Sequence, residues 1–176
     1  MTGLSRTVAL VGMMGAGKSS VGRRLAARLA VAFKDADSEI ELAAGAQVSE
    51  IFERYGEAAF RDGERKVIAR LLGEAPHVLA TGGGAFVDPQ TRERLKQGAV
   101  TVWIKAPVDV LLARVQRRDT RPLLRNDDPR GTLERLLAAR TPFYEEADVI
   151  VESDDGPHST AVDRIVSALK TRGVAS

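Results

Sequence analysis

The chain has 176 residues, of which 44% are hydrophobic and 28% are charged, and these values are ordinary for one globular domain with its own core. Cysteine is absent, which excludes disulfide bonds, thiolate metal sites and a cysteine nucleophile within this chain. The formal net charge is only +2 at pH 7, which argues against a general nucleic-acid binder.

Targeting and membrane signals are weak. Residues 1–17 contain a short apolar run that glycines interrupt, without the continuous apolar stretch and cleavage site of a signal peptide. No segment approaches the roughly 18 apolar residues that a membrane span needs. We therefore expect a cytoplasmic protein with neither a membrane nor a nucleic-acid partner. A monomer is the expected oligomeric state, although the sequence does not determine it.

Hydrophobic periodicity predicts alternating strands and helices along the first half of the chain. In chain order these are a strand at Thr7–Val11, a helix over 18–30, a strand over 31–34, and helices over 38–44 and 49–72. A glycine-rich loop separates the first strand from the first helix. We expect the long helix to break near Gly56, since glycine is a poor helix former.

The second half continues the alternation. Its predicted elements are a strand at Val78–Ala80, a helix over 89–97, a strand over 99–104, a helix from Pro107 to about Arg118, a helix over 129–145, a strand over 149–151 and a helix over 160–171. Residues 117–129 are rich in charge and turn formers and are predicted to be a mobile loop. Strands that alternate with helices favour right-handed crossovers, so we expect one α/β domain over 1–176, with a parallel sheet covered on both faces.

The loop after the first strand carries a phosphate-binding motif. Residues 12–19, GMMGAGKS, match GxxxxGK[ST] directly after a strand and at the start of a helix, which is the setting that the motif requires. The expected nucleotide-binding residues are Gly15, Ala16, Gly17, Lys18, Ser19 and Ser20. Backbone N–H groups and the helix dipole would hold phosphates, Lys18 would reach the β- and γ-phosphates, and the Ser19 hydroxyl would ligate Mg²⁺. The chain lacks the [NT]KxD motif by which GTPases read their base.

Two aspartates lie just beyond the second strand. Asp35 and Asp37 are two residues apart, so both side chains can reach the carboxyl edge of the sheet, where open α/β sheets place their ligands. Phosphoryl transfer needs carboxylates to hold Mg²⁺ and to orient or deprotonate the acceptor. The alternative is that Asp37 is the N-cap of the following helix, and the sequence leaves both readings open.

Two further motifs carry weaker signals. Arg61 and Glu64, in FRxxE, are three residues apart on one helix face, so they can pair simply as a surface ion bridge. Gly82, Gly83 and Gly84 follow the third strand, where glycines allow a backbone to approach a ligand closely or merely form a flexible turn.

Taken together and in this order, the motifs resemble those of the shikimate kinase family. They are GMMGAGKS at 12–19, the DxD at 35–37, FRxxE at 60–64, GGGA at 82–85, RPLL at 121–124 and RxPxY at 140–144. The resemblance implies a nucleoside-monophosphate-kinase-like P-loop fold, with three α/β/α layers and a five-stranded parallel sheet in the order 2-3-1-4-5. It also implies ATP-dependent phosphorylation of shikimate at its 3-hydroxyl, in the route to chorismate and the aromatic amino acids.

The resemblance also implies residue roles. Asp37 would contact the hydroxyls of shikimate and act as the base, and the two guanidinium groups of Arg61 and Arg140 would grip its carboxylate. Gly82, Gly83 and Gly84 would line the same pocket, within an acceptor-binding region over about 35–72. Arg121 would be a lid arginine, in a lid over 117–129, and would act on the phosphates together with Lys18.

On the nucleotide side the resemblance implies roles for three further residues. Asp35 would hold Mg²⁺ through water, beside Ser19. Arg114 would stack on adenine, and Pro157, in the turn at 155–157, would lie near the same base. Two alternatives stay open: a related kinase for gluconate or a nucleoside monophosphate, and a non-catalytic ATP-binding regulatory module.

Other conspicuous residues are given no catalytic role. His77 and His158 lack metal-ligand spacing and are expected to be structural or to face solvent. Met13 and Met14 are expected to pack beneath the phosphate loop, and Trp103 is expected in the core.

Overall fold

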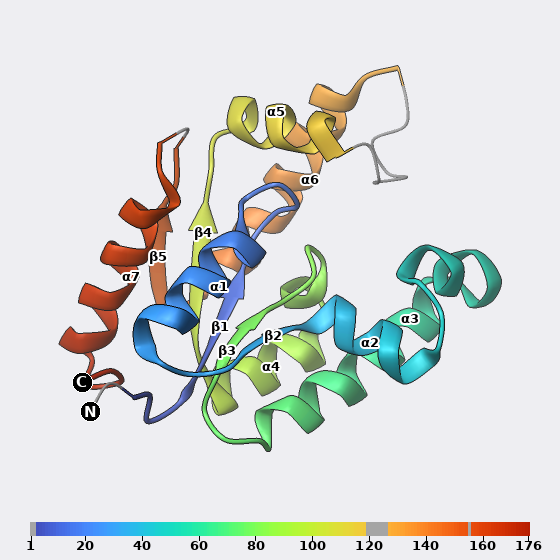
Figure 1. The fold of residues 1–176 in the computed structure, drawn as a ribbon. Coiled ribbons are helices and arrows are strands. Elements are labelled where there is room, and N and C mark those ends of the chain that lie inside the picture. The colour runs from blue at the N-terminus through green and yellow to red at the C-terminus, as the bar shows by residue number, and fades with distance from the viewer. Residues whose placement is uncertain (1–2, 119–126, 155) are drawn as a thin grey trace.

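The structure, a computed structural model, describes residues 3–118, 127–154 and 156–176. These residues contain a parallel five-stranded sheet in the order β2-β3-β1-β4-β5, with helices on both faces (Figure 1). The strands are β1 (Thr7–Val11), β2 (Phe33–Asp35), β3 (Val78–Ala80), β4 (Ala99–Lys105) and β5 (Val149–Glu152). The helices are α1 (Lys18–Leu29), α2 (Ala36–Ala44), α3 (Val48–Leu72), η1 (Ala85–Val87), α4 (Pro89–Gly98), α5 (Val108–Arg118), α6 (Pro129–Tyr144) and α7 (His158–Thr171). The expected α/β fold class and sheet order are confirmed.

Every predicted strand and helix is present, and the predicted bounds differ from the observed ones by no more than two residues. The most consequential shift concerns β2, which runs to Asp35 because its ladder with β3 pairs Asp35 with Ala80. Helix α2 then begins at once, at Ala36. The short 3₁₀ helix η1, after the glycine run, was not predicted.

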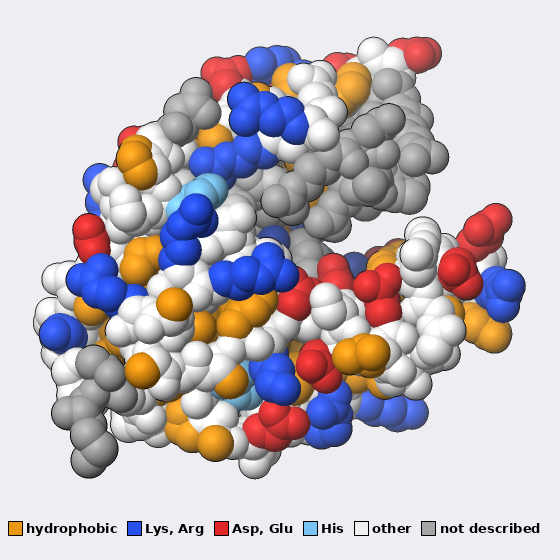
Figure 2. All heavy atoms as spheres, viewed as in Figure 1, with side chains coloured by type: hydrophobic (Ala, Val, Ile, Leu, Met, Phe, Trp, Pro, Cys, Tyr) orange, Lys and Arg blue, Asp and Glu red, His pale blue; other side chains and the backbone are white. Residues whose placement is uncertain are grey.

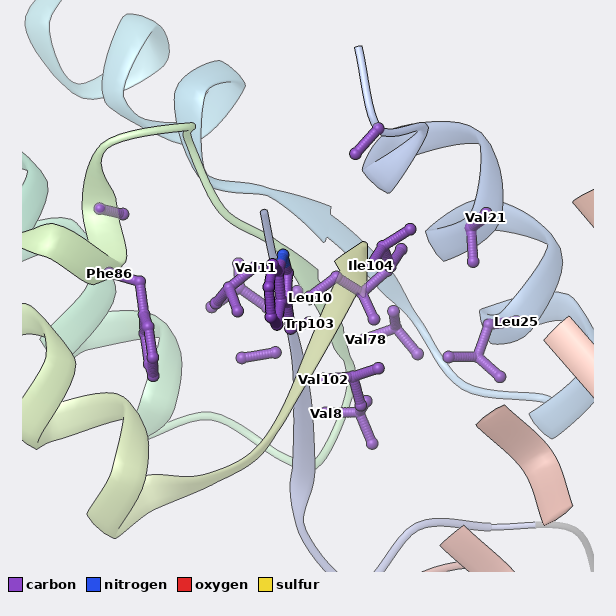
Figure 3. Packing of buried hydrophobic residues seen from close by; sticks show 14 of the residues in the cluster. Val8, Leu10, Val11, Val21, Leu25, Val78, Phe86, Val102, Trp103 and Ile104 are labelled. Atoms are coloured by element: carbon purple, nitrogen blue, oxygen red, sulfur yellow. The ribbon is translucent and has the colours of Figure 1, made fainter. Parts of the chain in front are cut away.

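The sheet separates two halves of the core (Figure 3). Val102 and Ile104 of β4 point toward Leu25 of α1, whereas Trp103 points to the opposite face, toward Phe86 of η1. All five side chains are at most 2% exposed, and burying a large apolar side chain contributes about 1.5–3 kcal/mol. The expectation that Trp103 belongs to the core is confirmed. The strands therefore form a rigid platform whose carboxyl edge carries the loops.

Helix α3 is two helices joined at a kink, as predicted. Gly56 has φ 83° and ψ 174°, a conformation that side-chain-bearing residues rarely adopt. The first part of α3 folds toward α2, and Phe52 packs on Phe60 with ring centroids 4.6 Å apart. The part of α3 after Gly56 therefore has a different direction and packs beside the loop Gly82–Gly84 that follows β3.

Within residues 3–118, 127–154 and 156–176, no helix is long and apolar enough to cross a membrane. Most of the predicted lid over 117–129, including Arg121, lies outside the described residues. The described parts of that range are the end of α5 and the residues that lead into α6.

An ion pair fastens α3 to the loop after β3. Arg65 donates from Nε and Nη2 to the two carboxylate oxygens of Asp88, at 3.0 and 2.8 Å. Asp88 also caps α4, because its Oδ2 accepts a hydrogen bond from the backbone N–H of Thr91 at 3.0 Å. The hydrogen bond from Arg65 is the main cause that lowers the pKa of Asp88 from 3.8 to about 2. A bidentate pair of this kind fixes orientation as well as distance.

We predict that the Asp88→Asn variant unfolds more easily at neutral pH but not near pH 2. Because the folded-state pKa is lower than the unfolded one, the carboxylate stabilises the fold fully above pH 3.8 and loses this effect as pH falls toward 2. The expected loss at pH 7 is about 2 kcal/mol, since asparagine keeps the helix cap but not the charge. Urea unfolding across this pH range measures it.

The matched control is Asp62→Asn, because Asp62 pairs with Lys66 at the surface and its side chain is 59% exposed. Exposed ion pairs contribute little, so this variant should unfold like the parent protein. A loss for Asp88→Asn that is equal at pH 7 and near pH 2 would show that the charge is not what stabilises this junction.

Candidate active site

The phosphate loop is a tight turn between β1 and α1. Gly12, Gly15 and Gly17 have φ angles of 145°, 82° and 93°, which favour glycine. Gly17 is the N-cap of α1, and Lys18, Ser19 and Ser20 form its first turn, so the amino end of the helix opens onto the loop. The N–H groups of such a terminus, with the helix dipole, form an anion site.

Lys18 and the two methionines complete this loop. Lys18 Nζ donates to the carbonyl oxygens of Gly12 at 2.6 Å and Met13 at 3.0 Å, which holds the ammonium group over the turn. Met13 and Met14 are 1% and 5% exposed. They are buried in the core beneath the turn, as predicted.

The end of β2 delivers a carboxylate to the same helix. Ser19 Oγ donates to Asp35 Oδ2 at 2.9 Å, and Asp35 Oδ1 accepts from the N–H of Ser38 at 3.2 Å. Asp35 is therefore the N-cap of α2, and the alternative that Asp37 is the cap is wrong. Asp37 lies inside the first turn of α2, because the strand extends to Asp35 and leaves no linker. The adjacent Ser19 and Asp35 oxygens are hard ligands of the kind that suit Mg²⁺.

Asp37 and Glu64 meet at Gly82. A Cβ atom placed on Gly82 would lie 2.9 Å from Asp37 Oδ1 and 3.4 Å from Glu64 Oε2. The two carboxylates thus approach the same short stretch of backbone from α2 and α3. Any side chain at position 82 would displace one of them, so the glycine here is a requirement of close approach.

Glu64 is wholly buried, so the interpretation of Arg61 and Glu64 as a surface ion bridge is wrong. Glu64 Oε1 accepts from Arg61 Nη1 at 2.8 Å, while the side chain of Arg61 is 17% exposed. Burial raises the pKa of Glu64, Arg61 opposes this effect, and the negative charges of Asp37 and Asp88 add to it. Glu64 Oε2 has no hydrogen-bond partner among the described residues. A buried oxygen in this state can accept from a ligand.

Arg61 and Arg140 converge on the rest of the glycine run. The guanidinium group of Arg61 lies directly against the position that a Cβ of Gly84 would occupy. Arg140 Nη1 donates to the carbonyl oxygen of Gly83 at 3.2 Å and lies 3.9 Å from Met13 Sδ. The structure therefore brings together Asp37, Arg61, Arg140 and the glycines, the residues to which the family resemblance assigns the acceptor.

Tyr144 is a member of this site to which the sequence reasoning gave no role. Its hydroxyl donates to the same carbonyl oxygen of Gly83, at 2.6 Å, and the side chain is fully buried. Its ring packs on Trp103 with centroids 5.5 Å apart. The RxPxY spacing was the available signal, since residues four apart on a helix lie on one face.

A second group of residues lies at the other end of the phosphate loop. Arg114 donates from Nη1 to the carbonyl oxygens of Ala16 at 3.0 Å and Gly15 at 3.3 Å, and from Nη2 to that of Asp154 at 2.9 Å. Pro157 is the N-cap of α7, in the segment that follows β5. Arg114 thus bridges the phosphate loop and the segment after β5, where the family resemblance implies the adenine.

The space-filling view shows how charge is distributed around these groups (Figure 2). Acidic side chains gather over α2 and α3, and basic side chains are prominent on the part of the surface that includes α1 and α5. No cluster of three or more His, Asp or Glu side chains suited to a metal occurs in the described part of the chain.

The sequence model of the shikimate kinase family matches residues 14–170. The chain belongs to the shikimate kinase family. A shikimate kinase of Paramagnetospirillum magneticum is 59% identical over 168 residues, which cover 96% of this chain and 86% of that protein. One from Caulobacter vibrioides is 58% identical over 166 residues, 94% of this chain and 83% of that protein.

Solved structures agree with this assignment. Shikimate kinase from Acinetobacter baumannii in complex with shikimate has a TM-score of 0.91 and 40% identity, and the match covers 95% of this chain and 94% of that one. A gluconokinase from Sinorhizobium meliloti has a TM-score of 0.55 and 19% identity, covering 97% and 98% of the two chains. The second likeness shows the shared fold alone.

We predict that Tyr144→Phe lowers the free energy of unfolding by about 1 kcal/mol, because the Gly83 carbonyl loses the shorter of its two side-chain hydrogen bonds and keeps the one from Arg140. Urea unfolding followed by tryptophan fluorescence measures this, since Trp103 is the only tryptophan and packs on Tyr144. Tyr55→Phe is the control, because Tyr55 is 67% exposed and should lose nothing measurable. Equal stabilities for the two variants would show that the hydroxyl does not hold the glycine loop.

Proposed function

We propose that this chain transfers the γ-phosphate of ATP to the 3-hydroxyl of shikimate, giving shikimate 3-phosphate and ADP, in the route to chorismate and the aromatic amino acids. One observation carries the proposal. A carboxylate, Asp37, and two guanidinium groups, Arg61 and Arg140, meet at Gly82–Gly84 beside a phosphate-binding loop. A small acceptor with hydroxyl groups and one carboxylate matches this set of charges, and the family supplies shikimate.

On the acceptor side, each group has a distinct task. Arg61 keeps donors for a ligand carboxylate while Glu64 holds its Nη1, and Arg140 lies opposite on α6. Asp37 then orients the 3-hydroxyl and accepts its proton as the oxygen attacks phosphorus. Fixing the acceptor in line in this way can supply about 7–11 kcal/mol of the barrier.

On the phosphate side, the N–H groups of the loop and Lys18 neutralise charge on the β- and γ-phosphates. The oxygens of Ser19 and Asp35 would hold Mg²⁺, which supplies further charge neutralisation on the phosphates when it is bound. Arg114 and Pro157 would border the adenine. Arg121 remains a predicted lid arginine whose position lies outside the described residues.

The site favours neither of the alternative functions, a related small-molecule kinase and a regulatory ATP-binding module. A gluconate kinase would share the fold, but the relatives named above are shikimate kinases at more than half identity. A regulatory ATP-binding module has no use for Asp37, Arg61 and Arg140 around one glycine run. Cytoplasmic location and a monomeric state remain predictions from the sequence.

The test is ADP release with Mg-ATP and a panel of acceptors: shikimate, gluconate and a nucleoside monophosphate. We expect turnover with shikimate alone, and a fall in kcat of about 100-fold or more for Asp37→Asn, since general-base catalysis contributes roughly 10²–10⁴-fold. Turnover only with gluconate or the nucleoside monophosphate would reject the proposed acceptor. Unchanged kcat for Asp37→Asn would remove this carboxylate from the mechanism.

We further predict that Arg61→Ala and Arg140→Ala raise the KM for shikimate about 10- to 100-fold and leave the KM for ATP nearly unchanged. Each variant loses a charged hydrogen-bond donor to the acceptor carboxylate, an interaction of about 1.5–3 kcal/mol. Steady-state kinetics with each substrate varied in turn measures the split.

The controls come from the same helices. Arg54 on α3 and Arg135 on α6 are exposed, so Arg54→Ala and Arg135→Ala should behave like the parent protein. Equal losses for shikimate and ATP in the Arg61 and Arg140 variants would mean that these residues support the fold rather than the acceptor.

A further inference from the structure

The phosphate loop has an acceptor end and an opposite end. At the acceptor end, a Cβ atom on Gly83 would lie 3.5 Å from the backbone nitrogen of Met14 and 3.4 Å from Arg140 Nη1. The γ-phosphate must face the acceptor, because transfer takes place there. The rest of the nucleotide must therefore leave the loop at its other end, past Gly17.

Two side chains lie at that other end. A Cβ atom on Gly17 would be 3.1 Å from His158 Cε1 and 3.3 Å from Arg114 Nη1. Arg114 was expected at the nucleotide, but His158 was expected to be structural or to face solvent. It comes from the first turn of α7, far away in the sequence, and its imidazole ring lies against the loop itself.

The ring of His158 has an unused hydrogen-bonding group. Its Nδ1 atom is buried and has no hydrogen-bond partner among the described residues. A buried polar atom in this state costs free energy unless a ligand or water satisfies it. Burial, and the positive charges of Arg114 and Arg24, lower the pKa of His158. The neutral ring offers one N–H donor and one acceptor nitrogen.

We propose that His158 is a nucleotide-binding residue, which uses Nδ1 to hold the α-phosphate–ribose portion of ATP beside Arg114. The inference rests on the proposed use of ATP at this loop. It adds a contact from α7 to those of the loop and of α5. The side chain would position the nucleotide and would take no part in the chemical step.

A direct test uses the parent protein and nuclear magnetic resonance. The chain has only two histidines, so the ring Cε1–Hε1 signals are few and can be assigned with one variant. His77 is an internal reference, because it is 2% exposed and lies just before β3, at the edge of the sheet opposite the phosphate loop. Addition of Mg-ADP should move the His158 signal and leave His77 in place. An unmoved His158 signal at saturating Mg-ADP overturns the proposal.

Variants test whether the ring nitrogen itself contributes. His158→Leu should weaken ADP binding about 3- to 10-fold in calorimetry, the size expected for one hydrogen bond. His158→Asn keeps a polar atom near the position of Nδ1 and should recover most of the affinity. Pyrophosphate, which lacks the nucleoside, should bind all three proteins equally, and the KM for shikimate should not change. The control is Ser159→Leu, which places the same side chain at the next, exposed position of α7 and should not weaken ADP binding.

The outcomes separate this proposal from the proposed function. Weakening of ADP and pyrophosphate by the same factor would show that His158 only supports the loop, and no weakening would show that it makes no contact. If His158→Leu does not fold, the proposal is tested by ADP binding to His158→Asn and by the His158 signal of the parent protein. A parent protein that binds ADP through His158 but phosphorylates no acceptor would overturn the kinase and leave the nucleotide contact intact.

Discussion

The close approach of charged side chains to the backbone of Gly82–Gly84 is the constraint on which the site depends. Two carboxylates, Asp37 and Glu64, and two guanidinium groups, Arg61 and Arg140, surround three residues that have no side chains. Opposite charges offset one another there, although burial still raises the pKa of Glu64. Glu64 is the buried member of the four, and a buried charge without a partner would cost several kcal/mol, so removal of Arg61 would leave this carboxylate without its ion-pair partner.

The surrounding packing fixes this arrangement from several directions. Arg61 and Glu64 face the glycines from α3, and the next residue, Arg65, binds Asp88 at the far end of the same loop. The loop is thus held to α3 at two places. Tyr144 and Arg140 both donate to the Gly83 carbonyl from α6, which fixes its direction. An acceptor would therefore meet groups that are already oriented, which is what catalysis by positioning requires.

The sequence was sufficient to predict the elements, their order and the phosphate loop, because periodicity and the GxxxxGKS motif are local properties. It allowed Asp37 as the N-cap of α2, whereas the cap is Asp35, since this depends on where the ladder between β2 and β3 ends. Glu64 looked like a surface residue because its burial comes from the loop after β3, which is distant in the sequence. The position of His158 against Gly17 likewise depends on how α7 packs beside α1.

The sheet order fits the proposed arrangement, in which acceptor and nucleotide would approach one loop from opposite sides. β1 is central. On one side of it lie β3 and then β2, which lead into Gly82–Gly84 and Asp37. On the other side, β4 and β5 are followed by the segments that carry Arg114 and His158. Among the described residues between β4 and β5, α6 reaches back to the acceptor side with Arg140. In the proposed function each half of the sheet serves one substrate, and the γ-phosphate would lie over β1, between the two.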